Sequence, residues 1–235
     1  MTQLAGLESG SEWVYLVQRP PASKILTYLV AKWAEYETQY SGIGEPFATR
    51  SEPVLTEGFA AFLDEARLAG HQPFHGEFIA ERRRCDLGPD GKRKIIGRTD
   101  IEWQLFGSPN FIVEFKVVGG GRPAKAYVSD GMVRFVDGRY GPQSVEGAMW
   151  AFFRPGSTEV ASHVAAIIDA HLDSLRSQAE DGMHRIAPSK IAPGTASFDS
   201  LHLRDPIAPT IRLAHIFVDI TSHLATGDDD SRLCC

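Results

Sequence analysis

The chain has 235 residues, of which 43% are hydrophobic and 23% charged, as in an ordinary globular protein with room for one large core. Its net charge of -6 argues against broad electrostatic adhesion to nucleic acid and leaves room only for local basic patches. Three cysteines are too few for a disulfide framework or a four-ligand zinc site. No apolar run approaches the ~20 residues that span a bilayer, so we expect a cytoplasmic protein without membrane contacts.

The first part of the chain is expected to be helical. Between residues 23 and 40, Ile25, Leu29, Trp33 and Tyr36 recur at helical spacing, which predicts an N-terminal helical extension covering residues 1–50. Residues 51–226 then form the main domain, and residues 227–235 form an acidic tail that we expect to be disordered.

A second helix is expected from Thr56 to Gly70. Thr56 is a suitable N-cap, and Glu57 then lies in the first turn. A carboxylate at that position has two interpretations of about equal weight. It either complements the helix dipole or contributes to a functional site.

Three strands are expected next. The first runs from Phe74 to Cys85, a turn at residues 89–91 follows, and the second runs from Lys92 to Leu105. The third, from 111 to 118, places Phe115 and its apolar neighbours on one face and Glu114 with Lys116 on the other. If the second and third strands pair as a hairpin, Asp100 lies beside Glu114. Charges in such an apolar strand need partners or a metal ion.

This arrangement of Asp100 followed by Glu114-Phe115-Lys116 resembles the core motif of the PD-(D/E)xK nuclease superfamily. Thr99 stands where the name of the superfamily has proline. The resemblance covers residues 51–153 and implies an α/β protein with a restriction-endonuclease-like αβββαβ core. In such a fold a mixed central sheet is flanked by helices, and here an N-terminal helix and a C-terminal strand would be additions.

The resemblance also implies a metal site. Asp100, Glu114 and the backbone carbonyl of Phe115 would bind Mg²⁺, with Mn²⁺ as a possible substitute, and Lys116 would orient the attacking water and stabilise developing negative charge. Glu57 would complete the catalytic set, with Glu77 on the first strand as its rival. The alternative without function is a buried ion pair between Glu114 and Lys116, with Asp100 exposed.

A basic cluster lies between the first two strands. It is a candidate nucleic-acid-binding surface that contacts phosphates, although, taken alone, the cluster favours a charged hairpin edge that prevents aggregation. The cluster consists of Arg82, Arg83, Arg84, Lys92, Arg93 and Lys94.

The rest of the chain supplies further elements. Residues 123–140 are expected to form a helix, with Lys125 and Arg134 within reach of phosphate, although Asp130-Gly131 also allows a hairpin turn. A strand at 148–153, a long helix at 157–179, a polar, turn-rich segment at 181–206 and a last strand at 210–221 follow. His215 in the last strand is expected to be a satisfied core or edge histidine.

The function implied by the resemblance is phosphodiester hydrolysis by a metal-dependent nuclease, an endonuclease or exonuclease that acts on DNA more than on RNA. Because no recognition domain is evident and the chain is acidic, a protein partner would supply targeting, as for a nuclease subunit or effector in antiviral defence or DNA processing. A homo-oligomer is also possible. The alternative is a non-catalytic nucleic-acid-binding or assembly subunit that keeps the fold.

Overall fold

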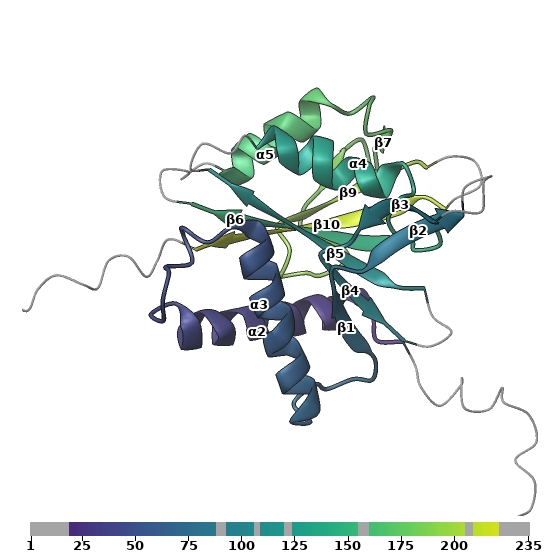
Figure 1. The fold of residues 1–235 in the computed structure, drawn as a ribbon. Coiled ribbons are helices and arrows are strands. Elements are labelled where there is room, and N and C mark those ends of the chain that lie inside the picture. The colour runs from purple at the N-terminus through teal and green to yellow at the C-terminus, as the bar shows by residue number, and fades with distance from the viewer. Residues whose placement is uncertain are drawn as a thin grey trace, which may run out of the picture.

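A central β-sheet lies between two layers of helices (Figure 1). The computed structural model describes residues 19–87, 93–105, 109–119, 124–154, 160–204 and 209–220, with the backbone alone for residues 83–87, 93–97 and 160–161. The helices are α2 (Ala22–Tyr40), α3 (Glu52–Leu68), the π-helix η1 (Tyr127–Met132), α4 (Val133–Val136) and α5 (Val160–Ala170). The strands are β1 (Glu77–Ala80), β2 (Arg83–Leu87), β3 (Arg93–Arg98), β4 (Ile101–Gln104), β5 (Phe111–Val118), β6 (Glu146–Phe153), β7 (Ser177–Gln178), β8 (Arg185–Ile186), β9 (Phe198–His202) and β10 (Ile211–Asp219).

The main sheet is mixed. Within the described ranges its strands follow the order β1-β4-β5-β6-β10-β9-β7, and β8 also pairs with β9. The β1–β4 and β4–β5 pairs are antiparallel, whereas β5, β6 and β10 run parallel to one another. The parallel β5–β6 pair needs a crossover, which η1 and α4 supply. The chain is therefore an α/β protein.

The two faces of the sheet carry separate cores. Phe111, Val113, Phe115 and Val117 of β5 pack with α2 and α3, whereas Ile112 packs with η1, α4 and α5 on the other side. This confirms the predicted alternation along β5. Helix α2 is part of the first core, because the rings of Trp33 and Phe152 lie 4.4 Å apart. Figure 1 shows α2 and α3 below the sheet and α4 and α5 above it.

The predicted hairpin of two long strands is paired as expected but bent. Each long strand divides in two: β1 and β4 belong to the main sheet, whereas β2 and β3 form a separate two-stranded ribbon. The bend lies at Glu81, which has a positive φ of 50°, and at Thr99 and Asp100 opposite it. The turn predicted at residues 89–91 falls outside the described residues. As a result, the ribbon leaves the sheet beside Asp100.

The segment after β5 is helical, as preferred, and Asp130-Gly131 is not a hairpin turn. Instead, Gly131 lies in the π-helical turn of η1. A Cβ at Gly131 would lie 2.4 Å from Cε of Met149 and 3.7 Å from Cε of Lys116. Glycine therefore lets the helix approach the sheet closely at Lys116, and π-turns of this kind are frequent at functional sites.

The C-terminal third differs most from expectation. The helix predicted for residues 157–179 ends at Ala170 in α5, and the segment 181–206 contains β8 and the buried strand β9. Strand β9 was missed because Asp199, Ser200 and His202 are polar although they are buried. The last strand was predicted correctly, but β10 lies inside the sheet, between β6 and β9.

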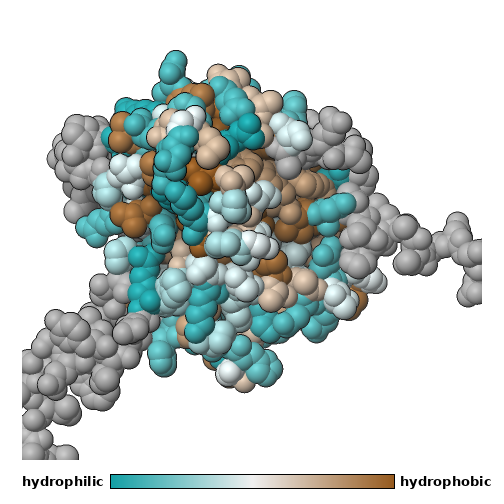
Figure 2. All heavy atoms as spheres, turned by 180° about the vertical axis from the view of Figure 1, so that it is seen from behind, coloured by the Kyte–Doolittle hydropathy of each residue, from teal (hydrophilic) through white to brown (hydrophobic). Residues whose placement is uncertain are grey.

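The surface is mixed in character. On the face opposite that of Figure 1, hydrophobic residues are interspersed with hydrophilic ones (Figure 2). Among the described residues, the exposed large hydrophobic side chains lie on α3 or in the connections between elements: Ile43, Val54, Leu68, Val145, Met183 and Leu203. None of the helices in the described part of the chain is long and apolar enough to cross a membrane.

Candidate active site

The site is built on the edge of β5 that β4 leaves uncovered. Register pairing between β4 and β5 ends at Ile101 opposite Val113, so the next N–H groups on that side of β5 lack ladder partners. Carboxylates take their place. Oδ2 of Asp100 accepts from the N–H of Phe115 at 2.7 Å, and Oε2 of Glu52 accepts from the N–H of Val117 at 3.1 Å. The backbone thus fixes two acidic side chains along one edge of the strand.

Glu52 comes from the start of α3. It is the first residue of the helix, after the N-cap Ser51 and before Pro53, so the helix dipole favours its negative charge. The N-terminal end of α3 lies over β5, which brings the carboxylate to the strand edge.

Lys116 binds this group of carboxylates from within the sheet. Its Nζ lies 2.8 Å from Oε1 of Glu114, 2.9 Å from Oε1 of Glu52 and 3.9 Å from Oδ2 of Asp100. Nζ also donates to the carbonyl oxygen of Phe115 at 2.7 Å. We call Glu52, Asp100, Glu114 and Lys116 the acidic cluster. The structure therefore brings Asp100, Glu114 and Lys116 together, with the Phe115 carbonyl beside them.

Glu114 is the most deeply buried member of the acidic cluster, with 0% of its side chain exposed. Besides Lys116, its Oε1 binds Nη1 of Arg134 at 2.8 Å. The same Nη1 donates to the hydroxyl of Tyr140 at 2.7 Å, and that hydroxyl donates to the carbonyl of Arg98. The interaction of Arg134 with Glu114 was missed because it depends on how α4 packs on β5, which no local pattern encodes.

The charges of the cluster perturb one another. Burial, followed by the nearby charge of Glu114, holds the pKa of Asp100 well above its ordinary value. Burial also raises the pKa of Glu114, although Lys116 and Arg134 oppose this shift. Burial alone would lower the pKa of Lys116, but the adjacent carboxylates raise it above its ordinary value. Lys116 thus remains an ammonium, and its single positive charge does not fully offset the burial and mutual repulsion of the three carboxylates.

The predicted fourth acidic residue is not where the sequence suggested. Glu57 is exposed on α3, since five residues beyond Glu52 is about 140° around the helix. Glu77 is exposed on β1 opposite Gln104, at the end of β4 remote from Asp100, and accepts a 2.7 Å bond from Gln104. Glu52 takes the place considered for both. Pro53 in the first turn was the signal that the helix begins before Thr56.

A comparison of buried carboxylates tests whether a cation fits. Within the described part, three carboxylate residues are fully buried: Glu102, Glu114 and Asp199. Both oxygens of Asp199 accept bonds from residues 189–191, and both of Glu102 accept bonds from neighbouring polar side chains. By contrast, Oε2 of Glu114 is buried and accepts no hydrogen bond from the described residues. A buried carboxylate oxygen without a partner suits a cation or a proton.

The cluster is not a ready-made metal cage. Across the described ranges, no three His, Cys, Asp or Glu side chains converge closely enough to hold an ion, because the Lys116 ammonium lies among the carboxylates. The side chains of Asp100 and Glu52 are nevertheless 17% and 20% exposed, so solvent reaches the cluster. Oxygen ligands open to water are the kind that Mg²⁺ prefers, so the type of donor fits that ion, although the side chains are arranged around Lys116.

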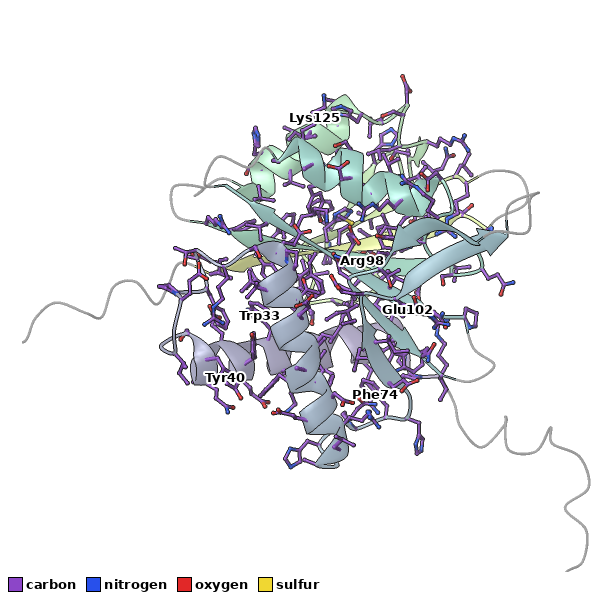
Figure 3. The ribbon with its side chains drawn as sticks, in the orientation of Figure 1. Trp33, Tyr40, Phe74, Arg98, Glu102 and Lys125 are labelled. Carbon is purple, nitrogen blue, oxygen red and sulfur yellow. The ribbon has the colours of Figure 1, made fainter. Side chains whose placement is uncertain are left out.

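Most of the predicted basic residues belong to the backbone of the β2–β3 ribbon, which meets the main sheet next to Asp100. Arg82 is anchored there, because its Nη1 lies 3.1 Å from Oε1 of Glu102 and also donates to Gln104. The side chains of Arg83, Arg84, Arg93 and Lys94 are outside the described part, and so is residue 92. Figure 3 shows Arg98 and Glu102 where the ribbon joins the sheet, and Lys125 at the far edge of the upper layer.

His215 is a satisfied core residue, as expected. Its Nδ1 accepts a 2.8 Å bond from the hydroxyl of Tyr127, and its Nε2 donates to Ser200 at 2.7 Å. Ser200 donates to Nε2 of His202, whose Nδ1 donates to the carbonyl of Leu175. This direction follows because a backbone carbonyl only accepts. The chain of bonds requires both histidines to be neutral and lies apart from the acidic cluster.

Comparison with known proteins does not assign the chain to a family. The chain matches no protein-family model, and neither the curated proteins nor the solved structures show a significant match to it. Functional inference therefore rests on the geometry of the acidic cluster and its surroundings.

Proposed function

We propose that the chain is a metal-dependent nuclease of restriction-endonuclease-like fold that hydrolyses phosphodiester bonds, in DNA more than in RNA. The observation that carries this proposal is the acidic cluster. Asp100, Glu114 and Glu52 meet one lysine at the edge of a buried strand, and one oxygen of the deepest carboxylate has no hydrogen-bond partner among the described residues. Such an arrangement is costly for stability alone, since buried ion pairs gain little over apolar packing.

The order of elements supports the fold assignment. If the β2–β3 ribbon is counted as the outer part of the two bent strands, the chain forms a helix, three antiparallel strands, a crossover helix and a parallel strand. These elements are α3, β1, β4, β5, η1 with α4, and β6. This is the αβββαβ order that the resemblance implies. Asp100 immediately precedes β4, and the side chains of Glu114 and Lys116 point from β5 toward the crossover helix.

Each residue of the cluster has a chemical role in this proposal. Asp100, Glu114 and the Phe115 carbonyl would hold Mg²⁺ or Mn²⁺, aided by Glu52, which takes the role first considered for Glu57. When bound, the ion supplies Lewis-acid stabilisation of the phosphoryl charge and a more acidic water. Lys116, held protonated by its carboxylate neighbours, stabilises negative charge as it develops through the charge of its ammonium, while its three N–H groups stay on acceptors within the cluster.

The test is cleavage by the purified chain with defined substrates. Plasmid, linear duplex, single-stranded DNA and RNA would be incubated with Mg²⁺, Mn²⁺ or EDTA. We expect metal-dependent cutting that Glu114→Gln and Lys116→Ala abolish and that the control Glu102→Gln retains. Glu102 is the matched control because it is equally buried on the same sheet but bonded to Arg82, Asn110 and Thr99.

The alternative is a non-catalytic subunit that keeps the fold. One observation favours it: in the structure every hydrogen of the Lys116 ammonium has an acceptor, so the cluster is internally bonded without an ion. Isothermal titration with Mn²⁺ distinguishes the two. Binding that Glu114→Gln weakens at least ~10-fold supports the nuclease, whereas no binding and no cutting of any substrate supports the assembly subunit.

A further inference from the structure

Lys116 has no donor left for a substrate. An ammonium has three N–H groups, and Nζ of Lys116 already has three acceptors, in Glu114, Glu52 and the carbonyl of Phe115. Its side chain is only 9% exposed. A phosphate that approaches the acidic cluster therefore needs another cation, because the carboxylates themselves repel it.

Arg134 is the cation at the cluster that keeps free donors. A guanidinium has five N–H groups, and only those of Nη1 are used, on Glu114 and on Tyr140. Nη2 and Nε have no hydrogen-bond partner among the described residues and are not buried, and the side chain is 30% exposed. Three donors in a planar fork thus remain beside Glu114, and such a fork matches two oxygens of a phosphate.

The position of Arg134 is fixed from two sides. Nη1 is held by Glu114 and by the Tyr140 hydroxyl, and the guanidinium lies 5.6 Å from the centre of the Tyr140 ring. The loop that carries Tyr140 is fastened in turn by Arg204. This buried guanidinium donates to the carbonyls of Phe135, Tyr140, Gly141 and Ser144 at 2.8–3.1 Å.

We propose that Arg134 binds the phosphate of the substrate at the cluster, through Nη2 and Nε, while Tyr140 and Arg204 act as positioning residues. This inference rests on the proposed function and adds the substrate-binding group that Lys116 does not supply. The contact also places the bound phosphodiester next to Glu114, because the same guanidinium binds both.

The experiment compares wild type with Arg134→Gln and Arg134→Lys. Binding of a labelled DNA duplex is measured by fluorescence anisotropy in EDTA, so that cleavage does not intervene, over a series of salt concentrations. We expect Arg134→Gln to weaken binding roughly 10- to 100-fold and to lower the slope of log K against log salt by about 0.9, as for one lost phosphate contact. Arg134→Lys keeps the charge and should retain the slope.

The control is Arg139→Gln. Arg139 is exposed on the same connection, but its guanidinium is paired with Asp137 at 2.6 Å. The Arg139→Gln variant should bind the duplex with the affinity of wild type. Mn²⁺ titration adds a second readout: loss of Arg134 removes a cation from Glu114, so Arg134→Gln should bind Mn²⁺ as tightly as wild type or more tightly.

The outcomes separate this inference from the proposed function. If Arg134→Gln binds the duplex with the affinity and salt dependence of wild type, the inference is overturned, but the proposed nuclease function is not affected. Loss of Mn²⁺ binding together with DNA binding would also overturn it, since Arg134 would then only support Glu114. Weakened duplex binding by Arg134→Gln in a chain that never cuts would sustain the inference and reject the nuclease. A wild type that neither binds nor cuts DNA would reject both.

Discussion

Replacing Lys116 with methionine tests whether its ammonium compensates the acidic cluster. Methionine keeps most of the buried stem of the side chain but leaves Glu114, Asp100 and Glu52 without the cation that lies 2.8, 3.9 and 2.9 Å away. Removing one partner of a buried ion pair destabilises a protein by about 3–5 kcal/mol. We expect a loss of that size at pH 8, measured by urea denaturation, and a Tm lower by roughly 6–20 °C.

The loss should depend on pH in one direction. The pKa of Asp100 and that of Glu114 are raised in the folded chain, and removing the ammonium raises them further. A carboxyl whose folded pKa is raised favours folding at low pH and loses that contribution as the pH rises through the folded pKa. The penalty of Lys116→Met should therefore shrink at pH 5. Millimolar Mg²⁺ should also stabilise this variant more than wild type, because the ion binds the folded chain.

The matched control for this substitution is Lys190→Met. Lys190 forms an exposed ion pair with Glu180 at 2.6 Å, and its side chain is 50% exposed. An exposed pair contributes about 0–1 kcal/mol, so this variant should be close to wild type at both pH values. A Lys116→Met variant that is equally close to wild type at pH 8, or that loses as much stability at pH 5, would refute the reasoning.

Two further predictions follow from the structure. Glu52→Gln should weaken Mn²⁺ binding, measured by calorimetry, by ~10-fold or more, whereas Glu57→Gln on the same helix should change it less than ~2-fold; equal effects would reject Glu52 as a member of the cluster. Burial lowers the pKa of His202 from its ordinary value of 6.5 to about 4, so the unfolded chain takes up a proton first as the pH falls. The contribution of His202 to the free energy of unfolding should then drop by about 3 kcal/mol between pH 6.5 and 4. In urea denaturation, the free energy of unfolding of His202→Gln should depend less on pH over this range. An unchanged pH dependence would contradict the lowered pKa of His202.

The centre of the fold could be predicted from the sequence because the residue patterns of β5 and α2 show which of their side chains are buried. Alternation along β5 assigns each residue to one face, and the aromatic stripe of α2 marks its buried side. The pairing of Asp100 with the Glu114 region follows from the same alternation once a hairpin is assumed. Local patterns of this kind depend only on residue type and period.

What could not be predicted depends on contacts between distant segments. The start of α3 was placed at Thr56 because threonine is a good cap, yet Glu52 begins the helix and binds β5, 65 residues further along the chain. Strand β9 reads as a turn-rich segment because its polar side chains are paired inside the protein. Arg134 reaches Glu114 only after a crossover, a π-turn and close packing at Gly131 have set the position of α4.

Several departures from ordinary folding rules lie close to the acidic cluster. Buried charges in an apolar strand, a positive φ at Glu81, the bend at Asp100 and a π-turn around Gly131 all adjoin the uncovered edge of β5. Single departures also occur elsewhere in the described part, such as the positive φ at Arg176 and Asp181, but the other two fully buried carboxylates, Glu102 and Asp199, are hydrogen-bonded within the protein. A stable fold has no need of such a concentration, and natural proteins break local rules mainly where function requires it. We therefore propose the edge of β5 as the functional site of the protein.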